Sequence, residues 1–289
     1  MKSPKIVSEI GCNHKGSMEI AKKMVKVAAE FVGADYVKFQ KRSNKELLSE
    51  EEYLSPHPNP KNSYGSTYGE HREFLEFSLE QHEELKSFCE KLKIGYATSV
   101  WDMTSAREII SLGSDFIKIP SACNLNFNLI DFLISEFSGD IHISLGMTNR
   151  EEEQRIMSRF EERGAFNRLV LYACTSGYPV PHKDVCLLEI NRFNESHRKK
   201  VKAIGFSGHH LGIAIDIAAQ TLGAEWIERH FTLDRTWKGT DHAASLEPDG
   251  FRRLVRDSKA VAESLEEKPQ EILEIEKPQR TKLKRFNLD

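Results

Sequence analysis

The sequence has few cysteines and no cysteine pairs. The five that occur among 289 residues are scattered and odd in number, and none forms a Cys-x-x-Cys pattern. This spacing argues against a disulfide framework and against structural zinc, and it favours a reducing compartment. Cys12, Cys123 and Cys174 lie near expected strand ends, and without a clear histidine partner they are interpreted as small apolar side chains rather than nucleophiles.

Long apolar runs and a large excess of one charge are also missing. No apolar run approaches the roughly 20 residues that a membrane-spanning helix needs. Strand-like residues begin at Lys5, which leaves no room for a signal peptide, so we expect a cytoplasmic protein with no membrane partner. A net charge of −3 provides no basic field for nucleic acid, so local basic positions are candidates for binding small anions.

The sequence does contain an alternation of short apolar segments with amphipathic ones. Hydrophobic residues make up 39% and charged residues 29%, a soluble globular balance, and the length suits one large α/β barrel or two ordinary domains. Strand character is found in segments 5–11, 36–40, 94–99, 116–119, 141–145, 168–173, 203–207 and 224–230. Helical spacing is found in segments 18–31, 78–92, 103–112, 127–137, 150–163, 213–222 and 248–265.

This alternation predicts a (β/α)8 TIM barrel as the catalytic domain over residues 1–265. The rival fold is an open doubly wound sheet, but no Gly-x-Gly-x-x-Gly motif follows the first strand. Two stretches lack clear periodicity. Residues 41–78 are expected to be a long loop that is functional or mobile, and residues 183–200 a charge-rich connection. Residues 266–289 form a charged tail, and we expect an extended arm or a disordered end there.

Nearly every expected strand ends in a polar side chain. In a TIM barrel the carboxyl ends of the strands form the rim that carries the chemistry. A purely structural barrel does not need polar groups at these positions. The rim residues are Glu9, Lys38, Gln40, Ser99, Lys118, Ser121, Ser144, Ser176, Tyr178, Ser207, His209 and His230.

Two lysines lie inside expected strands. Lys38 is flanked by Val37 and Phe39, and Lys118 has an isoleucine on each side. Because side chains alternate along a strand, lysines whose neighbours pack under the helices face the barrel interior. The alternative is a lysine that extends to solvent. Two inward ammonium groups surrounded by serine hydroxyls would bind a phosphate or a carboxylate.

Two histidines follow expected strands that are neighbours in a barrel. His209 comes after the seventh strand and His230 ends the eighth. Such a pair suits a divalent metal with open positions for water or substrate, although either could be a hydrogen-bonded core histidine. His210 and His242 leave the identity of the pair open. No third protein ligand is evident, so we expect a weakly held, exchangeable ion.

Glu9 and Asp241 are the carboxylates expected near this metal. Either could orient water, take a proton or bind sugar hydroxyls. Glu9 could instead simply neutralise Lys38, and Asp241 could merely stabilise its own loop.

A set of short motifs occurs in a fixed order along the chain. They are EIGCNHKGS at 9–17, VKFQ at 37–40, KIPS at 118–121, SLGM at 144–147, SGH at 207–209, ERHFT at 228–232 and GTDH at 239–242. Together they resemble the sialic acid synthase family over about residues 5–265. The ordered set is far more specific than any single motif.

The resemblance implies condensation of phosphoenolpyruvate with the aldehyde of an open-chain hexosamine, typically N-acetylmannosamine or a relative. The products would be a nonulosonic acid and phosphate. His209 and His230 would bind Mn²⁺ or Mg²⁺. Phosphoenolpyruvate would be bound by Lys38, Ser99, Lys118, Ser121, Ser144 and Ser207. The acceptor or the attacking water would be faced by Glu9, Gln40, Tyr178 and Asp241.

Three features depart from the family pattern. Cys123 stands where many members carry an acidic residue, so the group that activates water is not identified. Ser176, a candidate substrate-binding residue, stands where asparagine is common. Full-length members continue into a small antifreeze-like domain whose arginine reaches the partner's acceptor site, whereas this sequence ends at Asp289. We therefore expect acceptor recognition to use segment 41–78, the arginine-bearing tail or a separate protein.

Two other functions stay open at this point. Another phosphoenolpyruvate-condensing enzyme, such as an octulosonate phosphate synthase, would use a phosphorylated or shorter sugar and would need extra basic residues at the mouth. A non-catalytic sugar-binding or scaffolding subunit is the alternative from a different class. The presence of both histidines and both lysines argues against it. We expect a homodimer or a higher homo-oligomer.

Overall fold

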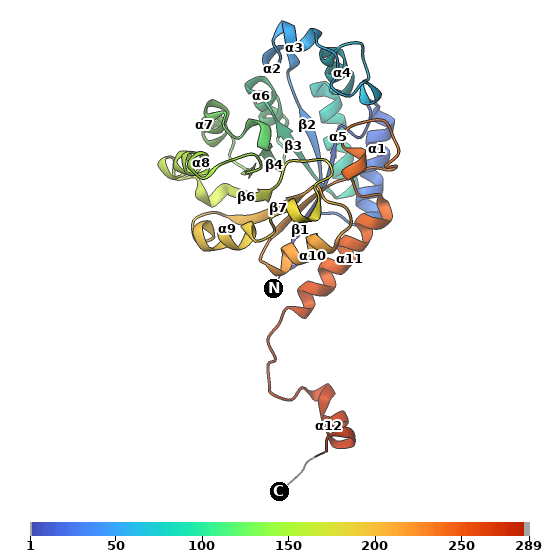
Figure 1. The fold of residues 1–289 in the computed structure, drawn as a ribbon, viewed down its shortest axis with the longest axis vertical. Coiled ribbons are helices and arrows are strands. Elements are labelled where there is room, and N and C mark those ends of the chain that lie inside the picture. Colours follow the sequence, from blue (N-terminus) through green and yellow to red (C-terminus); the bar gives the residue numbers. More distant parts are fainter. Residues whose placement is uncertain (1, 286–289) are drawn as a thin grey trace.

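Short apolar strands pair with their neighbours in the chain and close into a ring. The computed structural model describes residues 2–285, in which each strand runs parallel to the next and β8 returns to pair with β1 (Figure 1). The predicted TIM barrel is therefore confirmed. The strands are β1 (Lys5–Gly11), β2 (Tyr36–Lys41), β3 (Gly95–Val100), β4 (Phe116–Ile119), β5 (Asp140–Ser144), β6 (Leu169–Cys174), β7 (Ala203–Gly208) and β8 (Trp226–His230).

Amphipathic helices follow the strands and cover the outside of the barrel (Figure 1). Ser78 and Asn149 cap two of them, and each forms a capping box with the residue three positions on. The first helix continues as a π-helical segment over Val27–Val32. The main helices are α1 (Met18–Lys26), α5 (Leu79–Leu92), α6 (Met103–Leu112), α7 (Phe127–Glu136), α8 (Arg150–Glu162), α10 (Ala214–Thr221) and α11 (Pro248–Ser264).

Segment 41–78 is not a plain loop. It contains the short helices α2 (Asn44–Leu47), α3 (Glu50–Leu54) and α4 (Tyr68–Leu75), and a 3₁₀ turn over Pro60–Asn62. Helices of four to eight residues are too short for apolar periodicity to reveal. A usable sequence signal was the pair of capping boxes that open α3 and α4.

Two further stretches also contain helices that the sequence pattern did not predict. The connection 183–200 includes α9 (Glu189–His197), which buries only Ile190 and Phe193 and so has a weak pattern. The tail includes α12 (Lys277–Leu283), which lies away from the barrel at the end of an extended segment (Figure 1). Within residues 2–285, no helix combines the length and the apolarity that crossing a membrane requires.

Aromatic side chains fill the lower part of the barrel interior. Phe116 stacks on His142 with ring centroids 3.8 Å apart, and Trp226 packs edge-on against both rings. Tyr36 packs against Phe116, and His142 contacts the hydroxyl of Tyr172 at 3.0 Å. This aromatic floor lies beneath a layer of polar side chains at the carboxyl ends of the strands.

Candidate active site

Strand alternation directs both strand lysines into the barrel. Val37 and Phe39 belong to the apolar layer between β2 and the helices, so Lys38 between them faces inward and is 2% exposed. The isoleucines on either side of Lys118 belong to the same kind of layer, and Lys118 is 3% exposed. Both ammonium groups therefore lie inside, as alternation predicts.

Each ammonium group is paired with a buried carboxylate. Lys38 Nζ lies 2.6 Å from Glu9 Oε2 and donates a hydrogen bond to Ser99 Oγ at 2.6 Å. Lys118 Nζ lies 2.7 Å from Glu228 Oε1, and Lys38 Nζ lies 3.6 Å from the same oxygen. The two lysines and two glutamates form one layer of balanced charge, which we call the inner network.

Glu228 is a site residue that the sequence analysis missed. Its Oε1 also accepts a hydrogen bond from Ser207 Oγ at 3.3 Å, whereas its Oε2 has no hydrogen-bond partner among the described residues. Burial alone would raise the pKa of Glu228, but Lys118 and Lys38 outweigh it and hold the pKa to about 2. The signal was available, because Glu228 lies two positions before His230 on the same strand and so points the same way.

The inner network lies at the bottom of a cavity of about 330 Å³. All the predicted site residues except Asp241 line this cavity: Glu9, Lys38, Gln40, Ser99, Lys118, Ser121, Ser144, Ser176, Tyr178, Ser207, His209 and His230. The other lining residues are Trp101, Pro120, Ala122, Met147, Cys174, Gly177 and Glu228. The strand ends thus converge on one pocket, and the binding role of each residue stays a prediction.

His209 and His230 are the histidines that share the cavity. Their ring centroids are 5.4 Å apart, and the ring of Tyr178 packs against both, at 4.4 Å and 5.7 Å. His210 instead contacts the buried Arg229, and His242 contacts Thr232 Oγ1 at 2.8 Å; neither lines the cavity. The sequence alone did not show which two of these four histidines lie together.

The two predicted carboxylates occupy different positions. Glu9 lies in the cavity, where Oε1 accepts a hydrogen bond from Gln40 Nε2 at 2.8 Å while Oε2 pairs with Lys38. Glu9 therefore does neutralise Lys38. Asp241 does not line the cavity but lies beside His230, with Oδ2 3.8 Å from His230 Nδ1. Asp241 also accepts a hydrogen bond from Thr240, within its own loop.

Serines from three strand ends meet at Gly146. The Gly146 amide donates a hydrogen bond to Ser121 Oγ at 3.1 Å, and a Cβ on Gly146 would lie 2.4 Å from Ser176 Oγ and 2.7 Å from Ser121 Oγ. Only glycine allows this approach. Ser144 Oγ nearby is buried without a hydrogen-bond partner among the described residues. A buried hydroxyl that lacks a partner is a candidate ligand contact.

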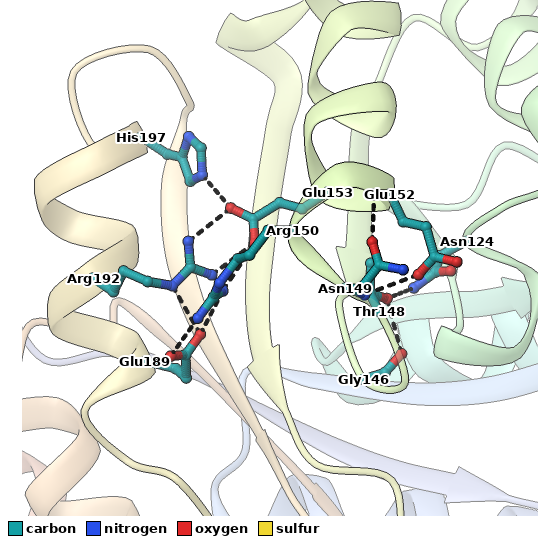
Figure 2. A network of polar contacts seen from close by, with 10 residues as sticks. All are labelled: Asn124, Gly146, Thr148, Asn149, Arg150, Glu152, Glu153, Glu189, Arg192 and His197. Atoms are coloured by element: carbon teal, nitrogen blue, oxygen red, sulfur yellow. Dashed lines mark hydrogen bonds and ion pairs between the residues drawn. The ribbon is translucent and has the colours of Figure 1, made fainter.

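Asn124 and Thr148 hold this serine cluster in place. Asn124 Nδ2 donates to Ser144 O at 3.0 Å and to Thr148 Oγ1 at 2.7 Å, and Thr148 Oγ1 donates to Gly146 O at 3.0 Å. Figure 2 shows the contacts of Thr148 with Asn124 and Gly146 beside the start of α8. They fix the backbone that follows β5.

Cys123 does not take the place of an acidic residue in the cavity. It ends the 3₁₀ turn Ser121–Cys123 and packs in the apolar layer outside β4 and β5. Burial raises the pKa of its thiol to about 11, which keeps it protonated at neutral pH. Cys174 does line the cavity, and burial raises the pKa of that thiol as well. Neither thiol has the thiolate character of a nucleophile.

The histidine pair fits a divalent ion with few protein ligands. His209 Nδ1 donates to the carbonyl of Thr175 at 3.0 Å, which leaves Nε2 as a free acceptor. Burial, together with His230, lowers the pKa of His209 to about 3, so the ring is neutral as a metal ligand must be. His230 Nδ1 is buried without a hydrogen bond. The described residues contain no group of three His, Cys, Asp or Glu side chains that could hold an ion, so water or substrate would complete the coordination.

Comparisons with known proteins agree with this architecture. The NeuB family model matches residues 24–270. N-acetylneuraminate-9-phosphate synthase of Homo sapiens is 36% identical over 276 residues, which cover 94% of this chain and 74% of that protein. N,N'-diacetyllegionaminic acid synthase of Campylobacter jejuni is 32% identical over 266 residues, which cover 92% of this chain and 78% of that protein.

A solved structure matches the whole barrel. The N-acetylneuraminic acid synthetase of Leptospira borgpetersenii superposes with a TM-score of 0.81 at 25% identity, covering 98% of this chain and 93% of that one. Because the family model spans most of the chain and named synthases exceed 30% identity over more than nine-tenths of it, the chain belongs to the NeuB family.

Proposed function

We propose that this protein is a nonulosonic acid synthase. It condenses phosphoenolpyruvate with an N-acetylmannosamine-like aldose and releases a 2-keto-3-deoxy sugar acid and phosphate. The supporting observation is that the ammonium groups of Lys38 and Lys118 open into the same cavity as the imidazoles of His209 and His230. Relatives named as N-acetylneuraminate-9-phosphate, legionaminic acid and pseudaminic acid synthases support this class of product.

The lysines and serines would bind phosphoenolpyruvate. Lys38 and Lys118 retain N–H donors for the carboxylate and phosphate, and the hydroxyls of Ser144 and Ser176 lie on the β5–β6 side. Because Glu9 and Glu228 already balance the lysines, a multiply charged anion would bring excess negative charge into the cavity. A divalent cation offsets that charge, which supports a metal requirement.

His209 and His230 would hold the ion, Mn²⁺ or Mg²⁺. When bound, it would polarise the acceptor aldehyde as a Lewis acid. The ring of Tyr178, packed against both imidazoles, would cover this part of the cavity and limit the access of water.

The bond changes follow from the two substrates. Carbon 3 of phosphoenolpyruvate bonds to the aldehyde carbon, whose oxygen takes a proton. Water adds to carbon 2, and the bond from carbon 2 to the phosphate oxygen then breaks to release phosphate. Lys38 and Lys118 would stabilise the negative charge on the carboxylate and the departing phosphate throughout.

A carboxylate must accept the proton of the attacking water. Cys123 is a buried thiol with a raised pKa and cannot serve. The remaining candidates are Glu9 and Glu228 in the inner network and Asp241 beside His230. Burial would raise the pKa of Asp241, but His230 and Thr240 hold it below its usual range, so it is an ionised base at neutral pH.

The test is a phosphate-release assay with purified protein, phosphoenolpyruvate, Mn²⁺ and a panel of aldoses, with the product mass measured. The expected product carries three carbons more than the aldose. Lys118→Ala should raise the KM for phosphoenolpyruvate by about 10- to 100-fold, since a charge-assisted contact is lost. Absence of phosphate release with every aldose, phosphorylated or not, would overturn the proposed function.

The acceptor itself has two chemical forms to consider. One relative is named for a 9-phosphate product, whereas the legionaminic acid synthase is not. Phosphoenolpyruvate supplies carbons 1 to 3 of the product, so a phosphate on carbon 9 comes from carbon 6 of a six-carbon aldose. The two forms therefore differ by a phosphate at the end of the sugar furthest from the reacting aldehyde.

A further inference from the structure

Helix α4 places a guanidinium group against Trp101, one of the residues that line the cavity. Arg72 lies with its guanidinium carbon 5.4 Å from the ring centroid of Trp101, and Trp101 lines the cavity. Arg42 stacks on the same indole at 4.1 Å. Two cationic planes therefore share one aromatic side chain on the β2–β3 side of the mouth.

Only one of these two arginines is neutralised. Arg42 Nη1 lies 3.0 Å from Glu76 Oε1, and Arg42 also contacts Cys12 and Gln40. Arg72 makes no hydrogen bond or ion pair with any residue in 2–285, and its ring contacts are to Tyr68 and Trp101. A partly buried guanidinium beside a second guanidinium, without a counterion, is electrostatically unfavourable unless an anion binds there.

Tyr64 joins this surface to a second segment of the chain. Tyr64 stacks on Phe74 with ring centroids 4.9 Å apart and donates a hydrogen bond to Lys238 O at 2.5 Å. This contact ties segment 41–78 to the loop that follows β8. That loop contains Asp241, whose Oδ2 lies 3.8 Å from His230 Nδ1. Lys238 Nζ lies over the Tyr64 ring at 4.7 Å and adds a further positive charge to the same surface.

We propose that Arg72 binds the phosphate of a phosphorylated aldose acceptor. The guanidinium holds the far end of the sugar at the mouth, while the aldehyde lies toward His209 and His230. A planar guanidinium can donate two parallel hydrogen bonds to a phosphate monoester. This assignment rests on the proposed function, and it selects the phosphorylated form of the acceptor.

The purely structural alternative is that Arg72 serves only to pack on Trp101 and Tyr68. In that case its loss would affect phosphorylated and unphosphorylated acceptors equally. Because Arg72 has no ion pair within the described residues, replacing it should lower the thermal midpoint by less than about 3 °C. Folding therefore does not obscure the test.

The experiment compares N-acetylmannosamine 6-phosphate with N-acetylmannosamine in wild type and Arg72→Gln. The KM for the phosphorylated sugar should rise about 10- to 100-fold in the variant, while kcat/KM for the unphosphorylated sugar and the KM for phosphoenolpyruvate change less than about twofold. Arg107→Gln is the matched control, because Arg107 stacks on Phe132 at 5.3 Å on the outer face of α6. It should change none of these values.

Calorimetric binding of the same two sugars, without phosphoenolpyruvate, separates this proposal from the proposed function. Tighter binding of the phosphorylated sugar that is lost in Arg72→Gln supports the arginine site even if no phosphate is released. Equal binding of both sugars, or an equal loss for both in the variant, overturns it. A rise confined to the KM for phosphoenolpyruvate would assign Arg72 to that substrate and would also overturn it.

Discussion

This molecule contains two networks in which two cationic side chains pair with two carboxylates. One lies inside the barrel and the other on its outside. The inner network joins Lys38 and Lys118 to Glu9 and Glu228 beneath the cavity, with side chains 2–6% exposed. The outer network, shown in Figure 2, joins Arg150 and Arg192 on the outside of the barrel to their own pair of glutamates, Glu153 and Glu189.

The outer network is complete. Arg192 donates to both oxygens of Glu153 at 2.9 Å and 2.7 Å, His197 adds a contact at 2.7 Å, and Arg150 donates to both oxygens of Glu189 at 2.9 Å. These contacts tie α8 to α9. Glu153 is buried, whereas Arg150, Arg192 and Glu189 are partly exposed. Because every carboxylate oxygen of the network is bonded, it needs no ligand.

The inner network is incomplete. Glu228 Oε2 within it, and Ser144 Oγ and His230 Nδ1 in the same cavity, are buried without hydrogen bonds among the described residues. A partly satisfied buried network is costly for folding, and such sites are typically completed by a ligand. The comparison teaches that similar charges are fully paired in one place and leave buried polar atoms unpaired in the other, where the proposed substrates would bind.

The largest expected difference is in stability after loss of one carboxylate. Glu228→Ala leaves Lys118 buried without its partner and should cost about 3–5 kcal/mol of unfolding free energy. Glu189→Ala in the outer network should cost less than about 1 kcal/mol, because water replaces the lost contacts. Urea denaturation of both variants measures this. Equal losses would contradict the distinction between the networks.

Replacing a histidine should affect enzyme activity differently in the two regions. His230→Ala removes one of two expected metal ligands and should reduce Mn²⁺-dependent phosphate release by more than about 100-fold. His197→Ala removes a contact to Glu153 in the outer network and should leave the rate unchanged. Wild-type activity of His230→Ala would remove this residue from the site.

Substitutions at two glycines test the serine cluster, with a smaller expected effect on activity. Gly146→Ala would push Ser121 and Ser176 apart and should raise the KM for phosphoenolpyruvate by about 10-fold. Gly250→Ala is the control, because the nearest atom to its added Cβ, on Leu246, is 3.7 Å away. Steady-state kinetics at fixed acceptor concentration measures both. An unchanged KM in Gly146→Ala would show that these serines do not hold the substrate.

The smallest effect is the pH dependence of the outer network. Burial would raise the pKa of Glu153, but hydrogen bonds from His197 and Arg192 outweigh it and lower the pKa from 4.5 to about 2. A depressed carboxyl pKa stabilises the fold above pH 4.5, and this stabilisation is lost as the pH falls from 4.5 through about 2. Glu153→Gln should therefore cost about 1–2 kcal/mol at pH 7, after allowing for solvent screening.

Denaturation of wild type and Glu153→Gln at pH 7, 4 and 3 would follow that loss. The stability gap between the two proteins should narrow steadily below pH 4.5. A gap that stays constant over this range would show that the Glu153 charge does not stabilise the fold.

Much of the site was predictable because alternation in strands is strict. The inward direction of Lys38 and Lys118 followed from their apolar neighbours, and the same rule, applied to the eighth strand, would have found Glu228. Arg72 could not be found this way, because α4 is too short for a periodic pattern and its position over Trp101 depends on packing between distant segments.

The sequence alone determined the barrel and its polar rim, since local apolar periodicity sets strand and helix identity and alternation sets which side chains face inward. Tertiary structure decided everything that depends on pairing between side chains far apart in the chain. It brought His209 and His230, out of four histidines, into one cavity and joined Glu228 to Lys118. It also placed Asp241 beside His230 and left Arg72 without a counterion among the described residues. These outcomes depend on distances of a few ångströms between strands and loops, which no local pattern encodes.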